Sequence, residues 1–103
     1  MNIGFSVKEL RTYARMSQKE LAKKAKLTQG YISNVEHGKQ QPTAKVIKRM
    51  CDALGVPVEI MWIMAMELKD TKPKFRALYK DLKPVIDALV QEILKDTYGR
   101  PKV

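Results

Sequence analysis

The stretch SQKELAKKAKLTQGYISNVEHGK, residues 17–39, encodes two short helices separated by a turn. Ser17 begins it with the pattern of a capping box, in which the serine hydroxyl and the Glu20 carboxylate each accept from the other residue's amide. Thr28 can cap the second helix with its hydroxyl, although Tyr31 replaces the acid there. We therefore expect a helix over 18–25, a turn over 26–28 and a second helix over 29–37.

Apolar side chains allow these two helices to pack closely against each other. Leu21 and the small Ala22 on the first helix lie opposite an apolar face of the second, formed by Ile32 and Val35. A small residue lets two helices cross at a steep angle, and a short turn between such helices is the arrangement of a DNA-binding helix-turn-helix.

The second helix also carries a polar stripe that points away from the first. Its members follow a helical spacing of three and four residues: Gln29, Gly30, Ser33, Asn34 and His37. Glutamine and asparagine can form two hydrogen bonds with adenine in the major groove, so the stripe suits base recognition. The spacing fits equally well a polar, solvated face on an ordinary small helical domain.

Helix signals continue on both sides of the central stretch. Ser6 and Glu9 form another capping-box pattern, which predicts a first helix over 7–15. Thr43 is the expected cap of a helix over 44–54. No segment alternates polar and apolar residues with strand-like composition, so the sequence predicts an all-α fold.

The second half of the chain is more apolar and less regular. Helices are expected over 57–70 and 74–96, with a frayed tail at 98–103. Pro84 lies inside the last of these helices and either kinks it or restarts it, because proline removes a donor and clashes with the preceding turn.

Composition narrows the classes of function. The chain has 103 residues, which fits one small domain, and a formal net charge of +9. Residues 1–55 hold eleven Lys and Arg against four Asp and Glu, whereas residues 56–103 hold nine against seven. This excess suggests a polyanionic partner, either nucleic acid or an anionic membrane surface; the alternative is a solvated basic face without a partner.

The residues needed for catalysis, metal binding and membrane insertion are scarce. A single cysteine, Cys51, excludes an internal disulfide framework and a Cys-rich zinc site, and one histidine leaves little for a metal centre. We therefore expect no enzyme activity, no metal and no cofactor. The longest apolar run, 60–66, is far shorter than the roughly 20 residues of a membrane span. Without a signal-peptide pattern, the expected location is cytoplasmic and no membrane partner is expected.

The stretch 17–39 also resembles the helix-turn-helix of the Xre family, the lambda-repressor-like DNA-binding domains. The resemblance extends from about Val7 to Ile60 and includes Leu10-Arg11, Ser17-Gln18, Glu20-Leu21-Ala22, Ile32-Ser33, Glu36-x-Gly38-Lys39, Pro42 and Ala53-Leu54-Gly55-Val56. It implies a compact five-helix domain at 1–70, with the motif at 17–37, followed by a C-terminal helical extension at 71–103.

The resemblance also implies roles for individual residues. Contacts with base edges are expected from Gln29, Tyr31, Ser33 and Asn34. Contacts with phosphates are expected from Gln18, Thr28, His37 and Lys39, and Gln18 is also expected to brace the first residue of the recognition helix. Gly30 stands where many relatives present a base-reading side chain. Lys26 stands where the family usually has glycine, so a left-handed turn would cost about 1–2 kcal/mol there.

Arg11 and Glu36 match a pair that, in similar domains, forms a largely buried ion pair between the first and third helices. A guanidinium can donate two parallel hydrogen bonds to a carboxylate, so the expected role of this pair is to fix the recognition helix.

The apolar surface of the second half must be covered. Either the last helix folds back over the fifth, or both pack against a second subunit. We expect a combination of the two, with a homodimer interface at Ile60, Met61, Trp62 and Met64. Met61, Met64 and Met66 are expected to be adaptable core residues rather than part of a cofactor site.

The resemblance and the charge together imply a sequence-specific transcriptional regulator of double-stranded DNA. The expected regulator is a repressor that binds a pseudo-palindromic operator as a homodimer, since two-fold sites need two-fold proteins. The alternative is a protein-binding module, such as an antitoxin whose C-terminal helices bind a partner protein.

Overall fold

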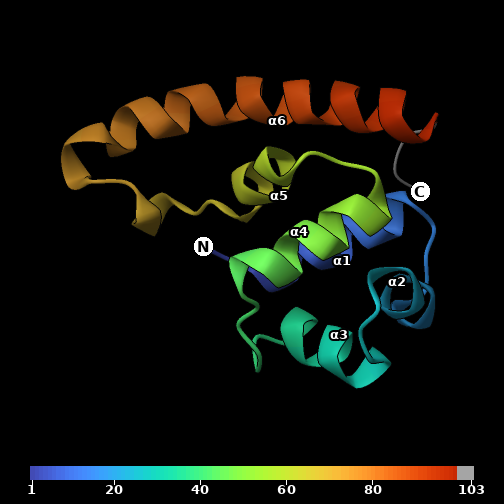
Figure 1. Ribbon diagram of the computed structural model, residues 1–103. Coiled ribbons are helices and arrows are strands. Elements are labelled where there is room, and N and C mark those ends of the chain that lie inside the picture. Colours follow the sequence, from blue (N-terminus) through green and yellow to red (C-terminus); the bar gives the residue numbers. More distant parts are fainter. Residues whose placement is uncertain (100–103) are drawn as a thin grey trace.

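The computed structural model describes residues 1–99, and this part of the chain is helical without strands. Six α-helices follow one another (Figure 1): α1 (Ile3–Tyr13), α2 (Gln18–Ala25), α3 (Gln29–Glu36), α4 (Ala44–Leu54), α5 (Val58–Ala65) and α6 (Arg76–Tyr98). Two 3₁₀ turns, η1 (Leu68–Asp70) and η2 (Pro73–Phe75), connect α5 to α6. The predicted all-α fold is confirmed, and within residues 1–99 no helix is long and apolar enough to cross a membrane.

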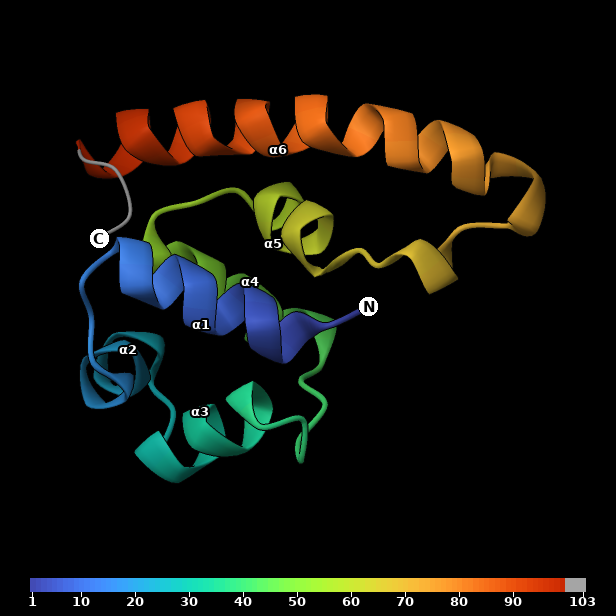
Figure 2. The ribbon, with the colours of Figure 1, turned by 180° about the vertical axis from the view of Figure 1, so that it is seen from behind.

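The helices are arranged in three levels. α1 and α4 lie in the middle, α2 and α3 lie on one side of them, and α5 and α6 lie on the other (Figures 1 and 2). Both views place α3 and α6 at opposite ends of the molecule. The first half of α6 extends past the end of the bundle, and η2 leads into it from below.

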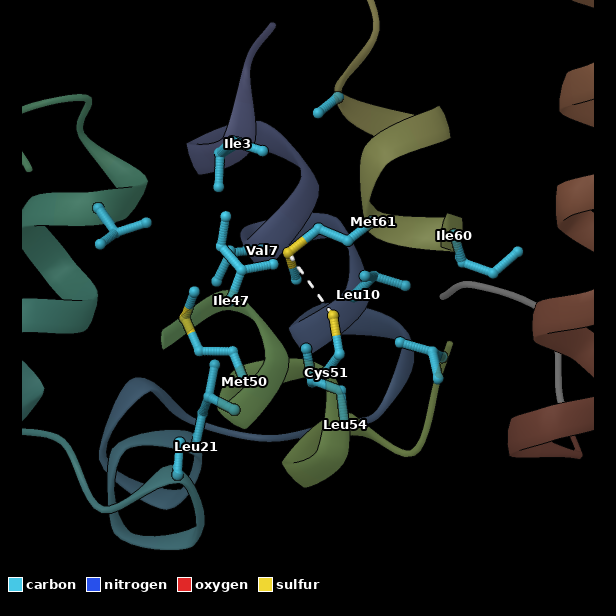
Figure 3. Close-up of a cluster of buried hydrophobic side chains, with 14 of the residues drawn as sticks. Ile3, Val7, Leu10, Leu21, Ile47, Met50, Cys51, Leu54, Ile60 and Met61 are labelled. Carbon is cyan, nitrogen blue, oxygen red and sulfur yellow. Dashed lines mark hydrogen bonds between the residues drawn. The ribbon is translucent and has the colours of Figure 1, made fainter. Parts of the chain in front are cut away.

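The middle level contains the hydrophobic core. Apolar side chains from α1, α2, α4 and α5 meet there (Figure 3), joined by Ile32 of α3 and Leu94 of α6. The largest fully buried side chains of this core are Leu10, Leu21, Ile32, Met50, Leu54, Met61 and Leu94. The Cys51 thiol lies 3.9 Å from the Met61 sulfur, and its burial raises the pKa of Cys51 to about 11. This thiol is therefore a packing group and not a nucleophile at neutral pH.

The first helix begins earlier than the sequence predicted. Asn2 caps α1 by accepting a hydrogen bond from the Phe5 amide, so Ser6 lies inside the helix and the predicted capping box is wrong. The Ser6 hydroxyl is fully buried and donates to the Met61 carbonyl over 2.8 Å. Asparagine caps helices as well as serine does, and the distant contact with α5 gives Ser6 a different role.

The fifth helix ends earlier than predicted, at Ala65 instead of residue 70. The Asn2 amide donates to the Ala65 carbonyl, and the Met1 ammonium group contacts the carboxylates of Asp70 and Glu67 in the segment that follows. These contacts hold the N-terminus against the end of α5. They join residues more than 60 positions apart, so no local pattern in the sequence predicts them.

The last helix folds back over α5, as one of the two predicted arrangements requires. Val90 and Leu94 enter the core, and the Tyr98 hydroxyl donates to the Leu54 carbonyl over 2.7 Å. Burial of this tyrosine raises its pKa to about 12. Pro84 lies within one continuous helix and does not restart it. Tyr98 belongs to α6; of the predicted frayed tail, residues 100–103 lie outside the described residues.

A glycine allows α1 to pack directly against the end of α3. A Cβ atom on Gly4 would lie 2.4 Å from the Val35 carbonyl oxygen and 2.9 Å from that of Glu36. Both are backbone atoms, which cannot move aside as a flexible side chain can. Gly30, in contrast, lies in α3 with no atom within 4 Å of an added Cβ.

We expect Gly4→Ala to destabilise the fold by about 1–3 kcal/mol or more, because the added methyl group forces α1 away from α3. Gly30→Ala is the matched control, and it should stabilise the fold by about 0.5–1 kcal/mol, because alanine favours a helix over glycine. Urea unfolding of both variants measures the two effects. Equal stability of the Gly4 variant and the parent chain would contradict the close packing.

Candidate nucleic-acid interface

The capping box predicted at the start of α2 is present. The Ser17 hydroxyl accepts from the Glu20 amide over 3.0 Å, and the Glu20 carboxylate accepts from the Ser17 amide over 3.1 Å. The hydrogen bond from the Ser17 amide is the main cause that lowers the pKa of Glu20. The cap fixes the orientation of the helix start, where backbone amides without partners inside the helix attract anions.

The turn between α2 and α3 contains a left-handed residue at Lys26, the position where the resemblance implied that glycine is usual. Lys26 has φ 59° and ψ 46°, a conformation in which a side chain other than glycine is strained. Arg49 on α4 holds this turn in place, because its guanidinium donates to the carbonyls of Ala25 and Lys26. Nothing in the sequence pattern had singled out Arg49 for this role.

The polar stripe on α3, which the sequence predicts to contact bases, lies at the surface. Thr28 caps the helix by accepting from the Tyr31 amide over 3.0 Å, as predicted. Gln29 and Asn34 are exposed, whereas Tyr31 and Ser33 are half-buried. The opposite side of α3 is anchored in the core through residues that are almost fully buried, Ile32 and Val35. The helix therefore offers an exposed polar side on a fixed backbone.

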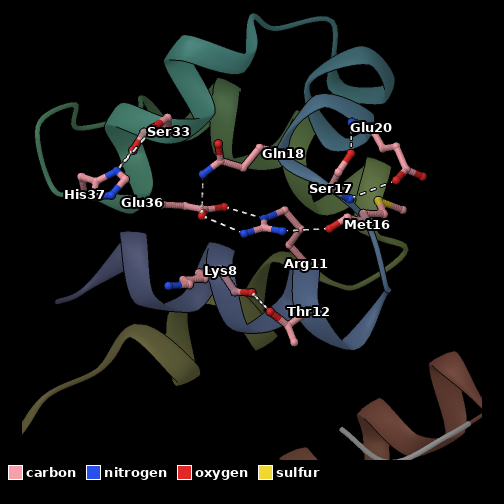
Figure 4. A network of polar contacts seen from close by, with 10 residues as sticks. All are labelled: Lys8, Arg11, Thr12, Met16, Ser17, Gln18, Glu20, Ser33, Glu36 and His37. Carbon is pink, nitrogen blue, oxygen red and sulfur yellow. Dashed lines mark hydrogen bonds and ion pairs between the residues drawn. The ribbon is translucent and has the colours of Figure 1, made fainter. Parts of the chain in front are cut away.

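Arg11 and Glu36 form the predicted ion pair between α1 and α3 (Figure 4). Arg11 Nε donates to Glu36 Oε2 over 2.8 Å, and its terminal nitrogen donates to Glu36 Oε1 over 3.0 Å. The Glu36 side chain is only 3% exposed. The same guanidinium also donates to the Met16 carbonyl in the loop before α2 over 2.9 Å.

Gln18 belongs to this network as well. Its amide nitrogen donates to Glu36 Oε1 over 3.0 Å, so the start of α2 is tied to the end of α3 (Figure 4). An amide nitrogen carries two hydrogens, and the second one can still donate to a phosphate. Gln18 is thus hydrogen-bonded to Glu36 at the end of α3, whereas the resemblance implied that it would brace Gln29 at the start of that helix.

The loop after α3 is held by its own backbone. The amides of Lys39 and Gln40 both donate to the Asn34 carbonyl, over 2.8 and 3.1 Å. These two amides are therefore engaged, and the exposed Lys39 ammonium group is what remains for a phosphate. His37 Nδ1 donates to the Ser33 carbonyl over 2.7 Å, so this ring nitrogen is engaged within α3 and its cap.

The comparisons with known proteins agree with this geometry. Residues 7–61 match the family described as Helix-turn-helix. An uncharacterised HTH-type transcriptional regulator of Mycobacterium tuberculosis is 29% identical over 98 residues, which cover 93% of this chain and 69% of that protein. The immunity repressor protein of Bacillus phage phi105 is 25% identical over 96 residues, which cover 93% of this chain and 65% of the repressor.

A solved structure supports the same similarity at the level of the fold. The crystal structure of the clp gene regulator ClgR from C. glutamicum superimposes with a TM-score of 0.61 and 26% sequence identity. The superposition covers 62% of this chain and 83% of that one. The bundle that carries α2 and α3 is therefore an arrangement also found in a known regulator.

We expect Arg11→Ala and Glu36→Ala each to destabilise the fold by about 3–5 kcal/mol, because each leaves the other charge buried without its partner. Asp52→Ala is the control: its ion pair with Lys48 is 62% exposed on both sides, and its loss should change stability by less than about 1 kcal/mol. Thermal unfolding of the three variants makes the comparison. Melting temperatures for Arg11→Ala and Glu36→Ala that equal that of Asp52→Ala would contradict a structural role for the buried pair.

We expect Lys26→Gly to stabilise the fold by about 1 kcal/mol, because glycine adopts the left-handed conformation without strain. Lys24→Gly removes the same charge from the helical part of α2 and should instead destabilise by about 1 kcal/mol. Chemical denaturation at one salt concentration compares the pair. A loss of stability in both variants would show that Lys26 is not strained.

Proposed function

The chain belongs to the helix-turn-helix family of DNA-binding transcriptional regulators, a non-enzymatic family, and on that premise we propose that it is a repressor that binds a pseudo-palindromic operator as a homodimer. The single observation that carries the proposal is the exposed polar side of α3, fixed by a buried ion pair to α1 and by apolar contacts to the core. A helix held in this way can enter the major groove without first ordering itself.

Base recognition in this proposal belongs to α3. Gln29 and Asn34 are exposed amides that can donate and accept at adenine. Tyr31 and Ser33 are half-buried and therefore reach only bases or phosphates close to the helix. Gly30 adds no side chain, so direct reading at its position is absent and the backbone can approach the groove closely.

Phosphate binding belongs to the surroundings of α3 and gives affinity without sequence information. Gln18 and Thr28 can each donate a remaining hydrogen while they keep the structural contacts described above. Lys39 supplies a full positive charge beyond the end of α3. His37 can donate to a phosphate through Nε2 only when that nitrogen also carries a proton, because Nδ1 is engaged with Ser33.

The repressor role is supported by the similarity to a phage immunity repressor. A protein bound across an operator prevents transcription simply by occupying the site, which requires no chemistry beyond binding. In this proposal residues 1–70 form the DNA-binding domain, and residues 71–103 form an extension that packs on it and assembles the homodimer.

A salt titration separates the two kinds of contact. We expect Lys39→Ala to weaken binding to the operator and to a scrambled duplex by similar factors. It should reduce the slope of the logarithm of the binding constant against the logarithm of the salt concentration by about one unit per subunit, because one fewer phosphate is neutralised. Asn34→Ala and Gln29→Ala should leave the slope nearly unchanged and remove roughly 1–3 kcal/mol of discrimination at particular base pairs.

The operator for this titration comes from selection of bound sequences in a random duplex pool, which also reveals the half-site spacing. Selection without any enriched sequence would contradict the proposed specificity. Equal weakening of operator and scrambled duplex by Asn34→Ala and Gln29→Ala would show that these side chains do not read bases.

A further inference from the structure

The first half of α6, together with the turn before it, carries an apolar stripe that its own chain does not cover. Its members succeed one another at spacings of three, four, three and four residues: Phe75, Leu78, Leu82, Val85 and Leu89. Each is between 45% and 65% exposed. This is the spacing of the a and d positions of a coiled coil, in which one helix packs along another.

The stripe is separate from the face that α6 turns toward its own bundle. That inner face consists of buried or half-buried residues, among them Tyr79, Ile86, Val90, Ile93 and Leu94. By their helical spacing the exposed residues lie beside this face. The first half of α6, which carries most of the stripe, extends past the bundle (Figures 1 and 2). α6 is thus apolar on two adjoining faces, and the described part of the chain packs against one of them.

The two ends of the stripe carry opposite charges. Lys72 and Lys74 precede Phe75 at one end, and the Lys74 ammonium lies 5.1 Å from the centre of the Phe75 ring. At the other end Glu92 and Asp96 continue the same spacing of three and four residues beyond Leu89. All four charged side chains are exposed. Along the stripe, one end is therefore positive and the other negative, whereas Lys95 in the last turn of α6 lies outside this spacing.

This distribution is unfavourable for an isolated helix. The start of a helix has a partial positive charge and its end a partial negative charge, so lysines before the start and acids near the end oppose the helix dipole. An antiparallel neighbour with the same sequence reverses the situation, because each positive end then lies beside a negative end. A parallel neighbour would place lysines beside lysines and acids beside acids.

We propose that α6 pairs antiparallel with α6 of a second copy of this chain, along this stripe and about a two-fold axis near Leu82. Phe75 then packs near Leu89 of the partner subunit, and Lys72 and Lys74 approach the acids of the partner's opposite end. A two-fold interface requires one surface to complement itself. The inference rests on the proposed homodimer and specifies its interface.

The interface lies away from the predicted recognition surface. α3 is at the opposite end of the molecule from α6 in both views, so pairing along the stripe leaves α3 uncovered in both copies (Figures 1 and 2). It also replaces two of the four residues of the interface expected from the sequence. Met61 is 0% exposed and Ile60 only 6%, so neither offers a surface to a partner, whereas Trp62 and Met64 are half-buried.

The first experiment disrupts the apolar contact. Leu82→Lys places two like charges next to each other at the two-fold axis, and should raise the dimer dissociation constant at least about tenfold. Ala77→Lys is the matched control, because Ala77 is exposed on α6 but outside the stripe. Sedimentation velocity over a concentration series gives both constants. Circular dichroism shows whether α6 keeps its helical content.

The second experiment reverses the charges at one end at a time. One variant combines Lys72→Glu and Lys74→Glu, and the other combines Glu92→Lys and Asp96→Lys. Each change favours the helix dipole, so neither should unfold α6. Each should nevertheless weaken self-association by about tenfold, because like charges then meet at both ends of the pair. An equimolar mixture of the two variants should recover the parent affinity, as should one chain with all four changes.

The results separate this inference from the proposed function. A dimer that persists unchanged in Leu82→Lys and in both charge variants would overturn the α6 interface while leaving the homodimer in place. A parent chain that remains monomeric at about 50 μM without DNA would overturn both this interface and the proposed homodimer. Base discrimination on a single half-site, measured in Leu82→Lys, should equal that of the parent chain, and its absence in both proteins would count against the DNA-binding assignment instead.

Discussion

The position of α3, the proposed recognition helix, depends on one buried carboxylate. Glu36 at the end of α3 accepts from the guanidinium of Arg11 and from the amide of Gln18, so helices α1, α2 and α3 meet at a single side chain. Taking these charges out of water is costly, and the attraction between them recovers that cost only when the geometry is good and other hydrogen bonds are satisfied. The main effect of the ion pair is therefore to fix the orientation of α3, because α3 can take up few other positions without leaving Glu36 unpaired.

Close backbone packing and the turn add to this constraint. Gly4 brings α1 against the carbonyl groups at the end of α3, on the same side as the ion pair. Arg49 holds the carbonyls of Ala25 and Lys26, where the chain leaves α2 in a strained conformation. The strain energy at Lys26 is small compared with the stabilisation from the contacts around it, which explains how a lysine can replace the usual glycine.

Local signals in the sequence predicted the starts of α2, α3 and α4 well. Ser17, Thr28 and Thr43 each cap the helix that follows, because a cap needs only residues within three positions. The same logic failed at Ser6, where Asn2 is an equally good cap and the serine hydroxyl meets α5 instead. The pairing of Arg11 with Glu36 followed from family resemblance, since residues 25 positions apart carry no shared spacing signal. Arg49 and the end of α5 depend on tertiary contacts and had no signal at all.

α1 connects the two surfaces to which we assign function, the exposed side of α3 and the outer face of α6. Toward α3 it contributes Gly4 and Arg11, and toward α5 and α6 it contributes Ser6 and Tyr13, whose hydroxyl groups donate to the Met61 carbonyl and the Gln91 side chain. Residues two positions apart, such as Gly4 and Ser6 or Arg11 and Tyr13, project from different sides of this short helix, so a single rigid element contacts both surfaces. A shift of α1 that improved its packing on α6 would also move Arg11 away from Glu36. The geometry of the α6 face and that of the recognition helix are therefore set together, although the two surfaces lie at opposite ends of the fold.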